Sequence, residues 1–118
     1  MSCRVLVVDD NKDATDILVL LLRCLGHDAS AAYNGQEALG MLDSFHPSVI
    51  VLDMSMPFLD GYQTASTIRA RTDGDMFHII AYTAIDDPLS VAKMVEVGCN
   101  ATLTKPASVE HLLKLFPS

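Results

Sequence analysis

The sequence has few basic residues and no long hydrophobic run. Eight Lys and Arg residues stand against 15 Asp and Glu residues, giving a formal net charge of −7. Proteins that bind DNA or RNA present a basic surface to the phosphate backbone, so this composition argues against nucleic-acid binding. The longest uninterrupted apolar run, 17–22, is far shorter than the roughly 20 residues that span a bilayer. Only four apolar residues separate Arg4 from Asp9, so no signal peptide is visible and no membrane insertion is expected.

Cysteines are also scarce. The three that occur, Cys3, Cys24 and Cys99, are odd in number and widely spaced. This pattern argues against a disulfide framework and against a CxxC zinc site, and it fits a reducing compartment. We therefore expect a cytoplasmic protein in which each cysteine is a small buried hydrophobe.

Hydrophobic residues make up 50% of the chain, which opposes disorder. A chain of 118 residues fits one domain and buries roughly 65% of the surface that it exposes when unfolded. We expect a single domain over 1–118, with no output domain in this chain.

Short apolar runs alternate along the chain with longer helical patterns. The runs predict five strands, at 5–8, 27–33, 49–52, 77–82 and 101–103. The intervening patterns predict five helices, at 14–25, 36–45, 62–71, 88–97 and 109–116, with Asn11 or Asp13 capping the first and Ser108 the last. Strands that alternate with helices predict an α/β fold with a doubly wound parallel sheet. The run 17–22 is too apolar for an ordinary surface helix, so part of it is expected to face a neighbour.

Polar side chains follow the predicted strands where each strand ends. They are Asp9 and Asp10 after the first strand, Asp53 after the third, Thr83 after the fourth and Lys105 after the fifth. Ligands of open α/β sheets bind outside the carboxyl ends of the strands. Three clustered carboxylates repel one another unless a cation intervenes, and oxygen ligands with open water positions suit Mg²⁺. A hydroxyl and an ammonium beside them suit a transferring phosphoryl group. The residues thus predict a Mg²⁺-assisted phosphoryl site with Asp53 as the candidate nucleophile.

Six fragments of the chain resemble the receiver domains of two-component response regulators. They are Val7-Val8-Asp9-Asp10-Asn11, Val51-Leu52-Asp53-Met54, Met56-Pro57, Asp60-Gly61, Thr83-Ala84 and Lys105-Pro106, in the order and spacing of that family. The resemblance implies a three-layer α/β/α, flavodoxin-like (βα)5 fold with a five-stranded parallel sheet in the order 2-1-3-4-5. It also implies phosphorelay signalling, in which an Asp accepts a phosphoryl group from a histidine kinase or a histidine phosphotransfer protein.

Carried over position by position, the resemblance makes Asp53 the phosphoacceptor. Asp10, Asp53 and the backbone carbonyl of Ser55 match direct Mg²⁺ ligands, while Asp9 matches an acid that acts mostly through water. Thr83 and Lys105 match the groups that bind the phosphoryl oxygens, and the bond from Lys105 to the following proline is expected to be cis. Such a domain is not a classical enzyme, although it assists its own phosphorylation and dephosphorylation.

Two positions depart from the family pattern. Thr102 and Ala107 stand where an aromatic is common, which puts aromatic switching and dimerisation through the last strand and helix in doubt. Ser55 and Ile85 stand two residues beyond the phosphoacceptor and the hydroxyl residue, at positions that in this family flank the path of the water that attacks the aspartyl phosphate. Because Ile85 makes no hydrogen bond and Ser55 has a short reach, we expect slow self-dephosphorylation.

Two alternative functions fit the sequence less well. A pseudo-receiver that binds partners without phosphorylation usually lacks an acid or the Lys, and none is missing here. A haloacid-dehalogenase-type phosphohydrolase carries Asp-x-Asp after its first strand, whereas this chain has Asp9-Asp10-Asn11. The output partner, the cognate kinase and the parent protein, a hybrid histidine kinase or a longer regulator, are not identified by the sequence.

Overall fold

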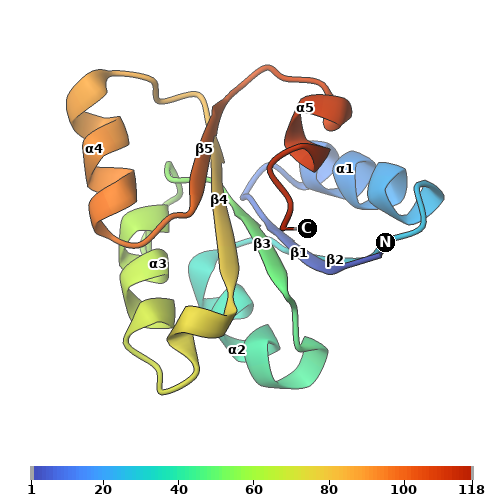
Figure 1. The fold of residues 1–118 in the computed structure, drawn as a ribbon, viewed down its shortest axis with the longest axis horizontal. Helices are drawn as coiled ribbons and strands as arrows, with labels where there is room; N and C mark the ends of the chain where they lie inside the picture. Colours follow the sequence, from blue (N-terminus) through green and yellow to red (C-terminus); the bar gives the residue numbers. More distant parts are fainter. Residues whose placement is uncertain (1, 118) are drawn as a thin grey trace.

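The computed structural model describes residues 2–117. The strands are β1 (Arg4–Val8), β2 (Asp28–Ala32), β3 (Val49–Leu52), β4 (His78–Thr83) and β5 (Ala101–Thr104). The helices are α1 (Lys12–Cys24), α2 (Gly35–Phe45), α3 (Gly61–Arg69), α4 (Pro88–Glu96) and α5 (Val109–Leu113), with a short 3₁₀ helix, η1 (Gly74–Met76), before β4. Figure 1 shows the alternation of strands and helices along the chain.

The five strands form one parallel sheet in the order β2-β1-β3-β4-β5, which confirms the predicted fold class. The register aligns the carboxyl ends of the strands: Val8 of β1 lies opposite Leu52 of β3. In the same way, Thr83 of β4 lies opposite Thr104 of β5. Residues that follow these strands therefore meet along one edge of the sheet.

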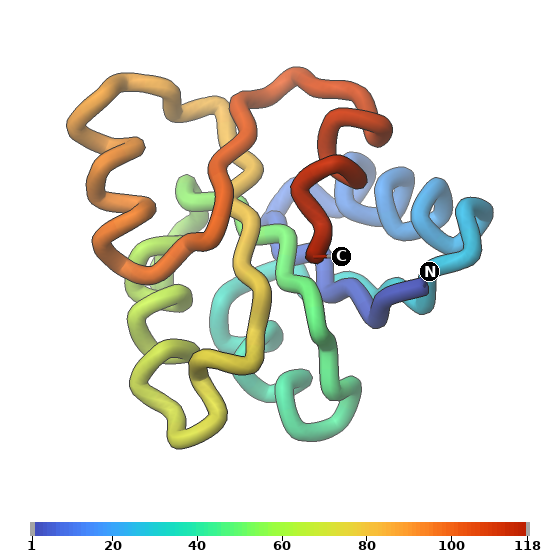
Figure 2. The backbone as a smooth tube through the Cα atoms, in the orientation of Figure 1, coloured from blue at the N-terminus to red at the C-terminus, as the bar shows by residue number. Residues whose placement is uncertain are grey.

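Helices cover both sides of the sheet, and the tube in Figure 2 shows α1 and α5 on one side with α2 and α3 on the other. Alternate residues of β1 serve the two sides, because successive side chains of a strand point in opposite directions. Leu6 and Val8 pack beneath α2, α3 and α4, in what we call the closed face. Val5 and Val7 pack beneath α1 and α5, in what we call the open face.

Side-chain caps begin the helices where the sequence indicates. Asn11, rather than Asp13, caps α1 by accepting a hydrogen bond from the backbone N–H of Ala14. Ser108 caps α5 as predicted. That helix ends at Leu113 rather than near residue 116, because the segment after it turns back to the sheet, where the His78 ring Nε2 lies 2.8 Å from the Leu115 carbonyl oxygen.

The prediction that all three cysteines are buried was wrong. Cys99 is buried, Cys3 is half-buried and Cys24 is exposed. The buried residues of α1 are Thr15, Val19 and Leu22, and the helical period of 3.6 turns position 24 away from that stripe.

Within residues 2–117, no helix has the length and apolar character to cross a membrane.

Candidate functional site

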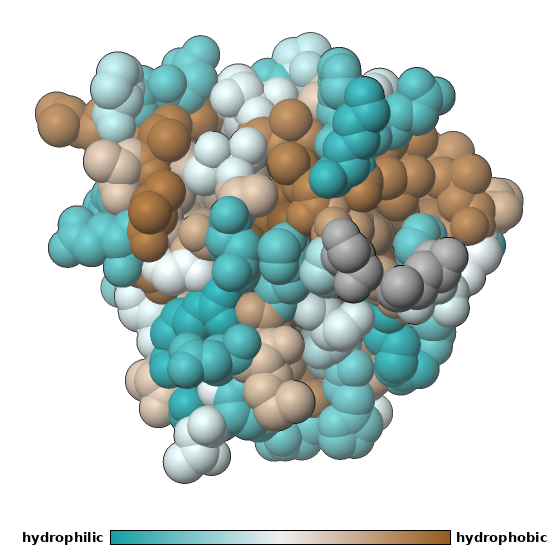
Figure 3. Space-filling model, in the orientation of Figure 1, coloured by the Kyte–Doolittle hydropathy of each residue, from teal (hydrophilic) through white to brown (hydrophobic). Residues whose placement is uncertain are grey.

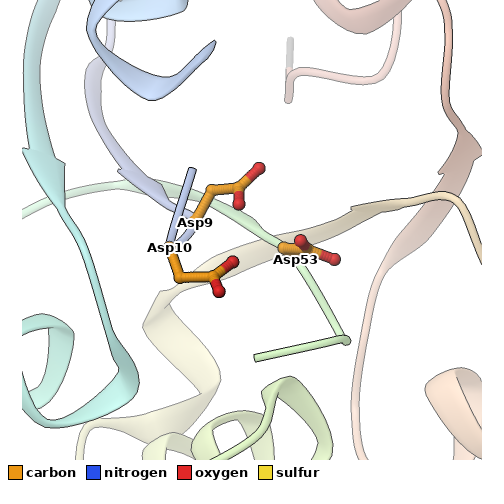
Figure 4. Close-up of side chains that lie close together, drawn as sticks. All are labelled: Asp9, Asp10 and Asp53. Carbon is orange, nitrogen blue, oxygen red and sulfur yellow. The ribbon is translucent and has the colours of Figure 1, made fainter. Parts of the chain in front are cut away.

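The acidic residues predicted from the strand ends come together at one edge of the sheet. The backbone N–H of Asp9 donates to the Ala32 carbonyl at 3.1 Å, and the backbone N–H of Asp53 donates to the Val8 carbonyl at 2.9 Å. Both residues thus continue the ladder of the sheet by one step. Figure 4 shows the side chains of Asp9 and Asp10 emerging beside that of Asp53.

One carboxylate oxygen from each of Asp9, Asp10 and Asp53 lies within 4.8 Å of the others. Asp9 is buried, Asp53 is half-buried and Asp10 is exposed. Oxygen donors at this spacing, open to solvent on the Asp10 side, fit a hard divalent cation that keeps part of its water shell. The donor set therefore fits the magnesium ion predicted from the sequence.

Lys105 reaches the same cluster from the end of β5. Its Nζ lies 2.5 Å from Asp9 Oδ2 and 3.7 Å from Asp53 Oδ2. The backbone N–H of Lys105 donates to the Thr83 carbonyl at 2.9 Å, and the bond between Lys105 and Pro106 is cis, as predicted.

Thr83 is the last residue of β4 rather than the first residue after it, and it is only 2% exposed. Among the described residues, its Oγ1 is the buried side-chain polar atom that has no hydrogen-bond partner. A buried hydroxyl left unpaired costs about 1–3 kcal/mol, so such an atom calls for a reason. Its place beside Asp53 supplies one, because an oxygen-rich group bound there would complete its hydrogen bonds.

The charges of the cluster are unequally compensated. Burial raises the pKa of the Asp53 carboxyl, and the hydrogen bonds and charges around it do not cancel this effect. Burial acts in the same direction on Asp9, but the backbone N–H of Asn11 and the Lys105 ammonium outweigh it and hold the pKa of Asp9 below its usual value. Burial opposes the charge of Lys105, yet Asp9 and Asp53 together raise its pKa. Asp9 and Lys105 therefore form the closer ion pair, and the negative charge of Asp53 is offset less than that of Asp9 by the surrounding groups.

The loop between β3 and α3 folds tightly against Asp53. The backbone N–H of Ser55 donates to Asp53 Oδ1 at 3.1 Å, and the backbone N–H of Gly61 donates to the Met54 carbonyl at 3.2 Å. A Cβ on Gly61 would lie 2.4 Å from both the Asp53 carbonyl oxygen and the Met54 Cα, so this turn requires glycine. Met54 and Met56 are buried, so both side chains serve the packing of this loop.

Sequence reasoning missed the contribution of Tyr82 to this site. Its hydroxyl donates to the Ala107 carbonyl at 3.2 Å, and Lys105 Nζ lies 5.3 Å from the centre of its ring. Tyr82 thus holds the turn after β5 in place, and with it the side chain of Lys105. A tyrosine in a strand gives no sequence signal of this role, which depends on the path of the chain after β5.

A groove of about 450 Å³ runs from the acidic cluster along the open face, between α1 and the turn before α5. Its apolar walls come from α1, the cis-proline turn and α5: Ala14, Ile17, Leu18, Leu21, Pro106, Ala107, Val109 and Leu112. Ile17 and Leu20 are 60% and 61% exposed, and Figure 3 shows the hydrophobic surface over α1. The helix is therefore more apolar on its outer surface than folding requires, as the run 17–22 indicated.

Comparisons with known proteins agree with this geometry. Residues 5–116 match the family model described as the response regulator receiver domain. The chain is 36% identical over 110 residues to the protein PilG of Pseudomonas aeruginosa, covering 93% of this chain and 82% of PilG. It is 36% identical over 113 residues to the response regulator MprA of Mycobacterium tuberculosis, covering 96% of this chain but only 48% of MprA. Among solved structures, the chemotaxis protein CheY4 of Vibrio cholerae superposes with a TM-score of 0.90 at 27% identity, covering 97% of this chain and 95% of CheY4.

Proposed function

Because this chain belongs to the response regulator receiver domain family, whose members act in two-component phosphorelay signalling, we propose that Asp53 is its phosphoacceptor. In the proposed step, a carboxylate oxygen of Asp53 forms a bond to phosphorus as the bond from phosphorus to a donor's imidazole nitrogen breaks. The imidazole nitrogen keeps the electron pair and takes a proton from solvent. Asp53 suits this role because Lys105 Nζ lies 3.7 Å from its Oδ2 but 2.5 Å from Asp9 Oδ2, so the Asp53 carboxylate is the less closely paired of the two.

Two side chains are positioned to hold the transferred group. Lys105 Nζ is 3.7 Å from Asp53 Oδ2, so a small movement brings it to an oxygen of a phosphoryl group on that carboxylate. The Thr83 hydroxyl lies close enough to the Asp53 carboxylate to lower its pKa, but it makes no well-formed hydrogen bond within residues 2–117, so it can donate to a second oxygen. This unpaired hydroxyl, beside an acid and a lysine, is the observation that carries the proposal.

Receiver domains bind Mg²⁺ at an aspartate cluster, and Asp9, Asp10 and Asp53 form such a cluster here. We propose that Asp10, Asp53 and the Ser55 carbonyl hold the ion directly, with Asp9 acting through water. When bound, the ion offsets the repulsion between the carboxylates and the incoming phosphoryl group. Asp9 contributes independently, because its ion pair orients Lys105.

Response regulators receive their phosphoryl groups from histidine kinases or phosphotransfer proteins, and we propose that such a donor docks along the groove of the open face. The groove begins at Asp53, and its apolar walls are surface that the fold itself leaves uncovered.

The chain spans less than half of MprA, so the output and its partner are not assigned. A cytoplasmic location, in keeping with the free thiols of 2–117, stays a prediction.

The test is incubation with acetyl phosphate and Mg²⁺, followed by mass spectrometry. The wild-type chain should gain one phosphoryl group and Asp53→Asn should gain none. Asp75→Asn is the matched control, because Asp75 is an exposed acid in η1, at the opposite end of the sheet. Labelling of Asp53→Asn at the wild-type level would disprove the assignment.

A further inference from the structure

The loop that follows Asp53 contains a phenylalanine in an unusual setting. Phe58 has φ 65°, in the left-handed region, and its side chain is 100% exposed. Among residues 2–117, the other non-glycine residue with positive φ is His46, which ends α2. Histidine is enriched in that conformation, whereas a bulky residue such as phenylalanine is a true outlier there.

The exposed ring of Phe58 does not help the chain to fold. A fully exposed aromatic ring buries no apolar surface, and the left-handed backbone disfavours any residue that carries a Cβ. The chain uses glycine at two other positive-φ positions, Gly26 and Gly98. Isolated exposed apolar residues need no explanation, but one that also imposes backbone strain points to a use outside the fold.

The position of Phe58 is fixed by the closure of its loop. The hydrogen bond from the Gly61 N–H to the Met54 carbonyl closes the loop between β3 and α3, and Gly61 lies against the Asp53 carbonyl. Phe58 is three residues from Gly61, so their Cα atoms are at most about 11 Å apart. A standard interface covers about 800 Å² on each partner, a disc of roughly 16 Å radius. An interface of that size centred on Asp53 therefore extends as far as the position of Phe58.

We propose that Phe58 is an anchor for the phosphodonor protein, entering an apolar pocket beside the donor's phosphohistidine and contributing to the choice of donor. This inference rests on the proposed function of Asp53. The groove approaches Asp53 from the open face, whereas the loop of Phe58 leads into α3 on the closed face, so the donor is held from two sides. Aromatic residues commonly dominate interface energies because a rigid ring fills a desolvated pocket.

The test compares two phosphodonors. Acetyl phosphate probes the chemistry of Asp53 alone, because it is too small to reach Phe58 while reacting. The protein donor is chosen by loading each purified histidine kinase core and phosphotransfer protein of the source organism with labelled phosphate. The one that transfers fastest to the wild-type chain is then used for all variants.

Phe58→Ala and Phe58→Gly should both take label from acetyl phosphate at the wild-type rate. Transfer from the protein donor should fall at least about tenfold in kcat/KM, mainly through KM. Phe58→Tyr should keep most of the wild-type rate. Both truncations should unfold at or above the wild-type temperature, because no packing is lost.

Two matched controls separate the role of Phe58 from general effects. Met76 is 80% exposed but lies in η1, at the opposite end of the sheet, so Met76→Ala should transfer normally. His46→Gly relieves a left-handed residue far from Asp53 and should also transfer normally.

The outcomes are distinct. Equal protein-donor rates for Phe58→Ala and the wild type would overturn the anchor and leave the assignment of Asp53 standing. A lowered unfolding temperature for Phe58→Ala would show that the ring packs within the fold, which also overturns it. Labelling by acetyl phosphate without transfer from any protein donor would overturn both the anchor and the docking proposal, while labelling of Asp53→Asn would overturn the phosphoacceptor itself.

Discussion

The closed and open faces of the sheet draw on alternate residues of the same strands, yet helices cover them unequally. On the closed face, α2, α3 and α4 bury Leu42, Ile68 and Met94 to 1% exposure or less. On the open face, α1 and α5 bury Leu22 and Leu112 equally well but leave a groove between them.

The strands do not cause this difference, because β1 and β3 are apolar on both sides. It arises from helix length: α5 has five residues and is only about 7 Å long, since a helix rises 1.5 Å per residue. A helix that short cannot cover the whole of the adjoining strands. The open face thus leaves an apolar groove beside Asp53, whereas the surface hollow between α3 and α4 on the closed face is lined mostly by polar residues.

The largest test of this contrast is truncation of one leucine on each face. Leu42→Ala on the closed face should destabilise the chain by about 3–4 kcal/mol, because the surrounding helices cannot collapse into the cavity. Leu112→Ala should cost about 2 kcal/mol, since the cavity adjoins the groove and α5 can shift. Urea unfolding monitored by circular dichroism measures both, and equal losses would contradict the contrast.

Thiol alkylation gives the next largest effect. Burial on the closed face raises the pKa of Cys99 to about 11, so at pH 8 about one Cys99 in a thousand is a thiolate. Cys24 on α1 is exposed, and we expect it to react with iodoacetamide at least about a hundredfold faster than Cys99.

The pH dependence follows from the raised pKa of Cys99. Because the thiolate reacts, alkylation of Cys99 should rise about tenfold with each pH unit up to about pH 11. Measurement in a Cys3→Ser background leaves one exposed and one buried thiol. Comparable rates for the two at pH 8 would show that the closed face opens readily.

The docking role of the open face predicts a moderate effect at Ile17. Ile17→Lys places a charge in the groove and should slow transfer from a protein phosphodonor about tenfold while leaving acetyl phosphate labelling unchanged. Stability should change by no more than about 0.5 kcal/mol, because Ile17 is already exposed. Leu20→Lys is the matched control, since Leu20 is equally exposed but does not line the groove.

The smallest effect concerns phosphoryl lifetime. Ile85 packs against the closed-face cluster, and we expect its apolar side chain to hinder a water that attacks the aspartyl phosphate. Ile85→Glu should shorten the lifetime of phosphorylated Asp53 a few-fold, as followed by loss of label in Mg²⁺. If the glutamate variant keeps its label as long as the wild type, shielding by Ile85 is the wrong explanation.

The sequence predicted the edge of the sheet well because strand ends are easy to locate. Apolar runs stop abruptly at Asp9 and Asp53, and a parallel register aligns such ends. The same reasoning placed Lys105 within reach of both carboxylates.

What the sequence did not predict depends on how the chain folds back on itself. The length of α5 is limited by contacts of Leu115 with the sheet, and η1 rests on local turns before β4. Tyr82 gains its role through the turn after β5. The residues around Phe58 form no pattern that predicts its left-handed backbone. These features follow from tertiary contacts, which a local pattern does not record.

The unpaired hydroxyl of Thr83 has a consequence for how sharply this domain can switch. An unmade buried hydrogen bond is worth about 1–3 kcal/mol, so satisfying it on phosphorylation shifts a two-state population by roughly thirtyfold at about 2 kcal/mol. An all-or-none response needs about ten-thousandfold. Under the proposed function, this hydroxyl by itself therefore supplies only part of the free energy of a full switch, and the remainder must come from other contacts that the phosphorylated form makes.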